Sequence, residues 1–224
     1  MVGGKFIVFE GIDGSGTSTQ ARLLVAALRH RGYAAALTSE PSNGPVGHLI
    51  RQIHHGRLHV SNDPRQVDRA LAYLFAADRF DHLHNQSDGV FTLIQNGTTV
   101  VSTRYWLSSF AYHVHDEDDY ALVRSLNANF PPPDLTLFLE CQPTEAICRI
   151  SSSGRIPDRN ENLETLRRVD LNYARALQSY AARLVRLIAT TSEPLLHQEV
   201  LRVVLDTMEH ESHDRNPVAG LLDS

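Results

Sequence analysis

A glycine-rich stretch that follows a short apolar segment constrains the fold of this chain more than any other feature. Residues 8–20 read VFEGIDGSGTSTQ, and residues 5–10 form an apolar, β-branched run that ends at the first of these glycines. Glycines tolerate unusual backbone dihedrals, so backbone N–H groups at such a turn can converge on an anion at the positive end of the next helix. The pattern predicts a strand, a phosphate-binding loop and a helix, with Ser18 as a ligand of Mg²⁺. The residues expected to contact nucleotide phosphates are Gly11, Asp13, Gly14, Ser15, Gly16, Thr17, Ser18 and Thr19.

Position 17 departs from the usual form of this loop, in which a lysine precedes the hydroxyl residue. Thr17 removes a cation that would lie between the β- and γ-phosphates of ATP. Two interpretations stay open. Either the protein transfers phosphate and takes its positive charge from another residue, or it binds nucleotides without catalysing the transfer.

Apolar and amphipathic segments alternate along the rest of the chain. Further strands are expected within residues 34–40, 96–105, 133–140 and 184–191, and helices over 17–33 and 67–83. Gly32 is the expected C-cap of the first helix. The apolar stripes comprise Leu23, Leu24, Ala27 and Leu28 in the first helix, and Ala70, Tyr73, Leu74, Ala77 and Phe80 in the second. Strands that alternate with helices predict an α/β fold with a parallel five-stranded sheet between two layers of helices.

The chain is expected to form one domain over residues 1–209, followed by a tail over 210–224 that lacks periodicity and is expected to be disordered. The 21 basic and 26 acidic residues give a net charge of −5, so neither a nucleic acid nor a membrane is expected as a partner. No apolar window suggests a membrane span or a signal peptide, and we expect a cytoplasmic protein.

Cysteine and histidine patterns give no reason to expect a disulfide or a zinc site. Cys141 and Cys148 lack disulfide or metal-ligand spacing and are interpreted as reduced thiols. The 12 histidines show no convincing ligand spacing. Those interpreted as surface or loop residues are His54, His55, His113 and His115.

Six segments in order, from about residue 6 to residue 200, resemble the thymidylate kinase family of P-loop nucleoside monophosphate kinases. They read FEGIDGSGTSTQ, EPSNGPVGHLIR, LFAADRFDHL, TRYWLSSFAYH, PDLTLFLE and GRIPDRNE. The resemblance implies a three-layer α/β/α fold of the P-loop NTPase type with a short lid at about residues 149–162. It also implies transfer of the γ-phosphoryl group of ATP to dTMP with Mg²⁺ as cofactor, in pyrimidine deoxynucleotide biosynthesis, by a homodimer.

The resemblance also implies roles for individual residues in the acceptor site. Arg104 would bind the acceptor phosphate, Phe75 would stack on the thymine ring, and Arg79 would hydrogen-bond to the edge of that ring. Tyr112 and Ser109 would approach the sugar, and Asp13 its 3′-hydroxyl or a metal-bound water. The remaining matches in these segments are Glu40, Pro41 and Arg51 in the E-P loop, and Ser108 and Tyr105 beside Arg104.

The lid and one further position bear on whether the protein is active. Arg159 and Arg155 match the lid arginines that stabilise the transferring phosphoryl group, and Arg149 precedes them. The family's aspartate before Arg-Tyr is Thr103 here, so the site loses one negative as well as one positive group. Arg155 or Arg149 could replace the charge missing at Thr17. The alternatives are a kinase for another or modified pyrimidine monophosphate and a catalytically silent nucleotide-binding protein.

Overall fold

The fold is built on a single sheet of five parallel strands in the order β2–β3–β1–β4–β5. The computed structural model describes residues 3–152, 154 and 160–214. The strands are β1 (Phe6–Glu10), β2 (Ala35–Ser39), β3 (Thr99–Thr103), β4 (Leu135–Glu140) and β5 (Leu184–Ile188). Phe9 pairs with Thr103 on one side and Leu137 on the other, so the carboxyl ends of β1, β3 and β4 meet at one edge of the sheet. The predicted α/β fold with a parallel five-stranded sheet is confirmed.

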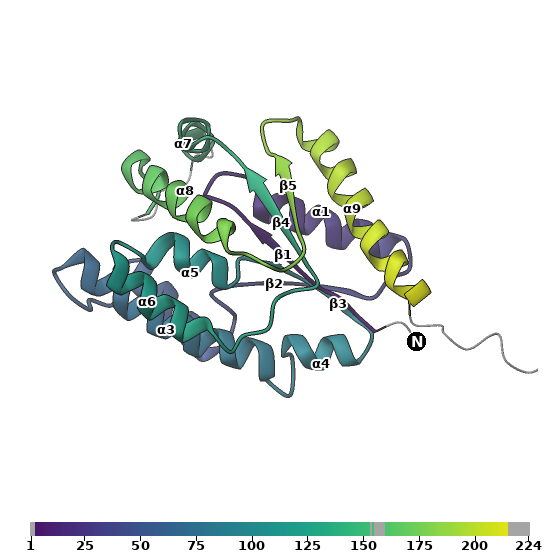
Figure 1. The fold of residues 1–224 in the computed structure, drawn as a ribbon, viewed down its shortest axis with the longest axis horizontal. Helices are drawn as coiled ribbons and strands as arrows, with labels where there is room; N and C mark the ends of the chain where they lie inside the picture. Colours follow the sequence, from purple (N-terminus) through teal and green to yellow (C-terminus); the bar gives the residue numbers. More distant parts are fainter. Residues whose placement is uncertain (1–2, 153, 155–159, 215–224) are drawn as a thin grey trace, which may run out of the picture.

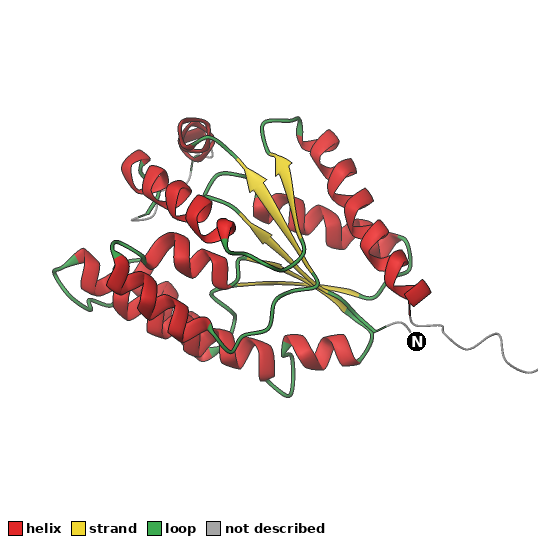
Figure 2. Cartoon of the chain, in the orientation of Figure 1, coloured by secondary structure: helices red, strands yellow, loops and turns green. Residues whose placement is uncertain are grey.

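Helices cover both faces of the sheet (Figure 1). The helices α1 (Thr17–His30) and α9 (Glu193–Asp214) lie on one face. The other face carries α3 (Pro64–His84), α4 (Val90–Gln95), α5 (Trp106–His113), α6 (Glu117–Asn127) and α8 (Leu163–Gln178). Against these pack α2 (Pro45–His54), which contacts α3, and α7 (Pro143–Ser152), which contacts α8. Figure 2 shows the strands enclosed between the two helical layers.

The first helix ends as its sequence predicts. Gly32 has φ 84° and follows the last helical turn. Its N–H donates to the carbonyl of Arg29, and the N–H of Tyr33 donates to the carbonyl of Leu28. This pair of bonds is the Schellman arrangement, which favours glycine because the residue must be left-handed. Within the predicted stripe, Leu24 and Leu28 are fully buried.

The apolar stripe predicted for α3 is not the buried face of the helix, although Leu74 is partly buried and packs against the core cluster that contains Phe75. Tyr73 and Phe80 are 53% and 61% exposed. The buried face of the helix instead combines apolar residues with polar ones that have partners. Its members include Leu71, Phe75, Asp78, Arg79 and His82. A pattern of hydrophobic residues cannot detect such a face, because it assigns every polar residue to the solvent-exposed side, including those that are buried with hydrogen-bond partners.

The last helix extends past the predicted start of the tail. α9 continues to Asp214 rather than ending before residue 210, and residues 215–224 lie outside the described part of the chain. Leu196, Val200 and Val204 recur at helical spacing and pack into the core, which anchors this helix to the sheet. No helix within the described residues is both long enough and apolar enough to cross a membrane.

Candidate active site

Two cavities open at the carboxyl ends of the strands, where ligands bind in open α/β sheets. The larger cavity has a volume of about 890 Å³ and is lined by the glycine-rich loop and the segment that follows β5. The smaller one, of about 370 Å³, lies between α2, α3 and α5. Asp13, Glu40 and Arg104 line both cavities, so a ligand in one would meet a ligand in the other at these side chains.

The glycine-rich loop has the geometry that its sequence predicts. Gly14 and Gly16 are left-handed, with φ 83° and 97°, and α1 begins directly after Gly16. A Cβ at Gly14 would lie 2.6 Å from the carbonyl oxygen of Ala146, so the loop packs too closely against α7 for any side chain there. A Cβ at Gly16 would meet nothing within 4 Å, because Gly16 faces the open cavity. The first turn of α1 thus presents backbone N–H groups and its positive dipole to that cavity.

Thr17 lies in the first turn of α1 and lines the larger cavity, as do Ser18 and Thr19. Among the described residues, the cations that line this cavity are Arg104 and Arg149. Arg149 projects from α7 and donates to the carbonyl of Ala189 at 2.7 Å, and more weakly to the carbonyl of Gly14 at 3.5 Å. Its guanidinium therefore lies directly against the glycine-rich loop, with Glu145 as its ion-pair partner.

Arg104 sits at the junction of the two cavities in a conformation rare for a side chain of its size. Its φ is 72°, the only positive value for a non-glycine residue in the described part of the chain. The guanidinium donates to the carboxylate of Asp13 and, at 3.0 Å, to the hydroxyl of Tyr112, over whose ring it also lies. The Tyr112 hydroxyl in turn donates to Asp13 at 3.0 Å. These three side chains, predicted from two separate segments, form one cluster in the structure.

Glu10 lies beneath this cluster, is 1% exposed, and was not predicted as a site residue. One oxygen accepts from the backbone N–H of Tyr105 at 2.9 Å, and the other from the hydroxyls of Ser108 and Tyr173 at 2.6 and 2.8 Å. Burial raises the pKa of Glu10 to about 7, although these hydrogen bonds oppose the shift. Because Glu10 holds both ends of residues 105–108, it helps to fix Arg104 in its unusual conformation.

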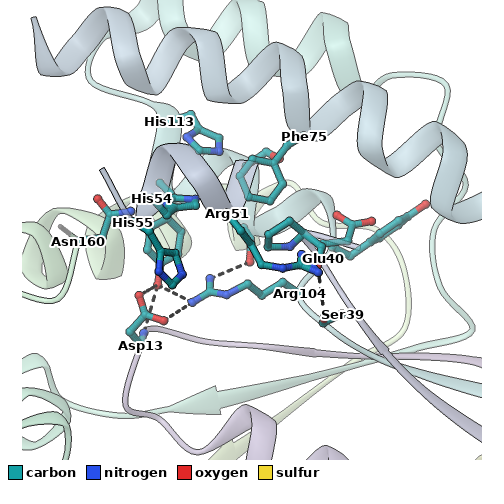
Figure 3. Close-up of a pocket in the computed structure, with 15 residues that line it drawn as sticks. Asp13, Ser39, Glu40, Arg51, His54, His55, Phe75, Arg104, His113 and Asn160 are labelled. Carbon is teal, nitrogen blue, oxygen red and sulfur yellow. Dashed lines mark hydrogen bonds and ion pairs between the residues drawn. The ribbon is translucent and has the colours of Figure 1, made fainter. Parts of the chain in front are cut away.

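The smaller cavity is lined at one end by Phe75, His54 and His113 and at the other by Asp13 and Arg104 (Figure 3). Predicted residues that also line it are Glu40, Pro41, Arg51, Tyr105, Ser108, Ser109 and Tyr112. His113 is 5% exposed, and His54 is partly buried. The interpretation of these two histidines as surface or loop residues is therefore wrong. Each of the two histidines is the last residue of its helix, a position that is often exposed. Nothing in the sequence shows that α2 and α5 face each other across a cavity.

Arg79 does not line either cavity. It is fully buried and donates to Glu40 at 2.9 and 2.6 Å, to Ser109 at 3.2 Å and to Asn127. The other oxygen of Glu40 lies 3.3 Å from His82. The structure thus brings Arg79 next to the smaller cavity but directs its guanidinium into a buried network rather than into the cavity.

Arg51 is likewise engaged by the protein itself. Its guanidinium donates to the carbonyl oxygens of Ser42 at 2.7 Å and Pro41 at 3.0 Å, and to the side chain of Asn43. Asp78 binds the same loop from α3, accepting from the N–H and the hydroxyl of Ser42 at 2.7 and 2.6 Å. These bonds set the shape of the wall that Glu40 and Pro41 present to the cavity.

The lid is only partly within the described residues. Arg155 and Arg159, predicted as catalytic, lie outside them, and α7 extends to Ser152, into the segment expected to form the lid. Thr103 closes β3 and lines the larger cavity. Within the described part of the chain, no three histidine, cysteine or acidic side chains gather as a metal site.

Comparisons with known proteins agree with this geometry. The model of the thymidylate kinase family matches residues 9–200. The chain belongs to this family. A probable thymidylate kinase of Pyrococcus abyssi is 32% identical over 202 residues, which cover 90% of this chain and 96% of that protein. Thymidylate kinases of Pelotomaculum thermopropionicum and Exiguobacterium are 35% and 32% identical, each over 92% of this chain and 95% and 96% of their own lengths. The family resemblance noted in the sequence is confirmed.

Proposed function

We propose that this member of the thymidylate kinase family transfers the γ-phosphoryl group of ATP to dTMP and releases ADP and dTDP. ATP would occupy the larger cavity, with its phosphates on the glycine-rich loop, and dTMP the smaller one. The observation that carries the proposal is the shared wall of Asp13, Glu40 and Arg104 between the cavities. Phosphoryl transfer needs two phosphates to meet in line, in a site that neutralises their charge.

Arg104 is the residue best placed to hold the acceptor phosphate. Arginine binds phosphate through two parallel N–H groups, and Asp13 and Tyr112 hold this guanidinium at the junction. Burial is the largest single effect and lowers the pKa of Arg104, but Asp13, Tyr112 and Tyr173 together outweigh it, so this pKa lies well above its usual value. The side chain therefore stays cationic through the reaction.

We propose Arg149 as the cation that replaces the missing lysine. Besides Arg104, it is the cation among the described residues that lines the larger cavity, and its contact with the carbonyl of Gly14 would place it where phosphate charge accumulates. Arg155 and Arg159 would add charge from the lid, as the family resemblance implies.

Mg²⁺ fits the donor set of the larger cavity. Ser18, Asp13 and Thr103 present only oxygen atoms there, and hard cations of this size prefer oxygen ligands. Ser18 would hold the ion against the phosphates of ATP. When bound, it would neutralise charge on the transferring group.

We also propose that the protein is a cytoplasmic homodimer. Both cysteines carry free thiols, which suits a reducing compartment. The exposed stripe of α3, with Tyr73 and Phe80, offers an apolar face that a second copy would cover by two-fold symmetry.

The activity is tested by incubating the protein with ATP, Mg²⁺ and dTMP and measuring dTDP by chromatography, with Thr17→Lys assayed beside it. We expect the native protein to form dTDP at an ordinary kinase rate, of order 1–100 s⁻¹. If both nucleotides bind, but only the lysine variant forms product, the native protein is a silent binder and the proposal is wrong.

A further inference from the structure

The carboxyl end of α5 is held by side chains of α8, which packs along it (Figure 1). Arg168 donates to the carbonyl oxygens of Tyr112 at 3.3 Å and Val114 at 3.2 Å. Asn172, one turn further along α8, donates to the carbonyl oxygens of Ala111 at 3.0 Å and Val114 at 2.9 Å. The last carbonyls of a helix have no partner within that helix, and its dipole favours a cation there. Residues of α8 therefore cap α5 from outside.

A buried carboxylate on α3 lies beside the same guanidinium. Asp68 is 4% exposed, and one of its oxygens lies 3.9 Å from Arg168. The same oxygen lies 2.8 Å from the ring of His115, just past the end of α5. Arg168 thus joins three helices, α3, α5 and α8. A guanidinium suits this place because its planar fork of N–H groups can serve several acceptors at once.

The capped end of α5 carries a residue of the candidate active site. Tyr112 lies in the last turn, and its hydroxyl accepts from the backbone N–H of Asp13 at 3.1 Å and from Arg104 at 3.0 Å. The same hydroxyl donates to the carboxylate of Asp13 at 3.0 Å. Tyr112 is therefore bound at its carbonyl by Arg168 and at its hydroxyl by two residues that line both cavities. Because hydrogen bonds depend steeply on distance and angle, a shift of this helix end would weaken all three bonds of the hydroxyl.

We propose that Arg168 is a positioning residue of the acceptor site, which fixes Tyr112 and, through its hydroxyl, the pair of Asp13 and Arg104. Arg168 lines neither of the two cavities, so it would act on the monophosphate only through Tyr112. The inference rests on the proposed function, because that function places dTMP in the smaller cavity.

Binding measured by titration calorimetry tests the inference apart from catalysis, with dTMP and a non-hydrolysable ATP analogue as separate ligands. We expect Arg168→Met to weaken dTMP binding about tenfold, as for one or two lost hydrogen bonds, and to leave the analogue within about twofold of its native affinity. Arg168→Lys keeps the charge but can reach one carbonyl at a time, so it should weaken dTMP only about threefold. The matched control is Arg175→Met, which removes an exposed ion pair with Glu117 from the same helix and should change neither affinity.

A double-mutant cycle with Tyr112→Phe separates positioning from a general structural effect. If Arg168 acts through the Tyr112 hydroxyl, adding Arg168→Met to Tyr112→Phe should weaken dTMP by no more than a further factor of about two. Additive losses, about a hundredfold in the double variant if each single change costs about tenfold, would overturn the inference.

Two further results of the same titrations would also overturn the inference. One is an equal loss of affinity for dTMP and for the analogue in Arg168→Met, and the other is native affinity for dTMP in that variant. If Arg168→Met does not fold, Arg168→Lys completes the same cycle with Tyr112→Phe. A native protein that does not bind dTMP would reject the proposed function, on which the inference rests.

Discussion

At the scale of single residues, Thr17 and Arg149 are linked because they share one cavity. The chain lacks a lysine in its glycine-rich loop, and α7 brings a guanidinium to the same backbone. A cation that takes the place of the loop lysine can come from a distant part of the sequence, provided that the helix that carries it lies against the loop. Arg149 was considered from the sequence together with Arg155, and nothing in the sequence could rank the two.

If Arg149 supplies the missing charge, Arg149→Ala should lower kcat for dTDP formation by about a hundredfold, with a smaller change in KM for dTMP. Removal of one preorganised charge from a phosphoryl-transfer site commonly costs about 3 kcal/mol. The matched control is Arg202→Ala, because Arg202 forms a similar i,i+4 ion pair on α9 far from the cavities. An unchanged kcat in Arg149→Ala would reject this role.

Glu10 makes stability depend on pH in an unusual direction. Its pKa is about 7 in the folded protein and 4.5 in the unfolded chain. Between these values the folded state binds the extra proton, so the free energy of unfolding falls as pH rises and levels off above pH 7. A shift of this size corresponds to about 3 kcal/mol.

Glu10→Gln should remove that dependence, because the amide stays neutral. We expect native and variant proteins to be similarly stable near pH 5, and the variant to be more stable near pH 8, by up to about 3 kcal/mol. Urea unfolding at both pH values measures the difference. Glu199→Gln, at an exposed position of α9, should show no such dependence. A Glu10→Gln effect that is the same at both pH values would contradict the assignment.

At the scale of elements, α3 has two faces with separate tasks. Its inner face supplies Phe75 to the cavity and Asp78 and Arg79 to buried networks, and its outer face carries Tyr73 and Phe80. The sequence predicted the helix and, through the family resemblance, the importance of Phe75 and Arg79, but its apolar stripe did not identify the buried face. Polar residues dominate a buried face only when partners from β2, α5 and α6 are present, and these partners are distant in sequence.

If the outer face of α3 forms the dimer, Phe80→Glu should convert the protein to a monomer, because two charges would oppose each other across a two-fold axis. Sedimentation velocity measures the change. Leu171→Glu is the matched control, since Leu171 is 71% exposed on α8. A native protein that is monomeric at micromolar concentration would reject the dimer itself.

The loop after β2 depends on Arg51. Arg51→Met keeps much of the side-chain volume but leaves the carbonyls of Pro41 and Ser42 without their donor. Unsatisfied carbonyls cost about 1–3 kcal/mol, so we expect a lower Tm and a KM for dTMP raised about tenfold or more. Arg57→Met changes an exposed residue outside the cavity and should alter neither quantity. A normal KM in Arg51→Met would show that the loop keeps its shape without this clamp.

At the scale of the whole molecule, the two cavities predict additive stabilisation by two ligands. Each nucleotide at about 100 times its Kd should raise the free energy of unfolding by about 2.7 kcal/mol. Thermal unfolding with a non-hydrolysable ATP analogue, with dTMP and with both measures this effect. Stabilisation by dTMP but not by the analogue would indicate that the loss of lysine at position 17 has weakened the donor site.

The sequence by itself determined the α/β fold, the glycine-rich loop and the family, because these depend on local conformation and on motifs that follow each other along the chain. Gly14, Gly16 and Gly32 are examples, since each is required by a backbone conformation within a few residues.

Only the tertiary structure decided which side chains line the two cavities. In the folded chain, Arg79 and Arg51 bond to other groups of the protein, His113 and His54 line the smaller cavity, and Arg149 lies against the glycine-rich loop. The physical reason is that a polar group is directed by the partners it finds in space. Strands 1 and 3 are adjacent in the sheet but separated by nearly ninety residues of chain, so those partners cannot be read from neighbouring positions.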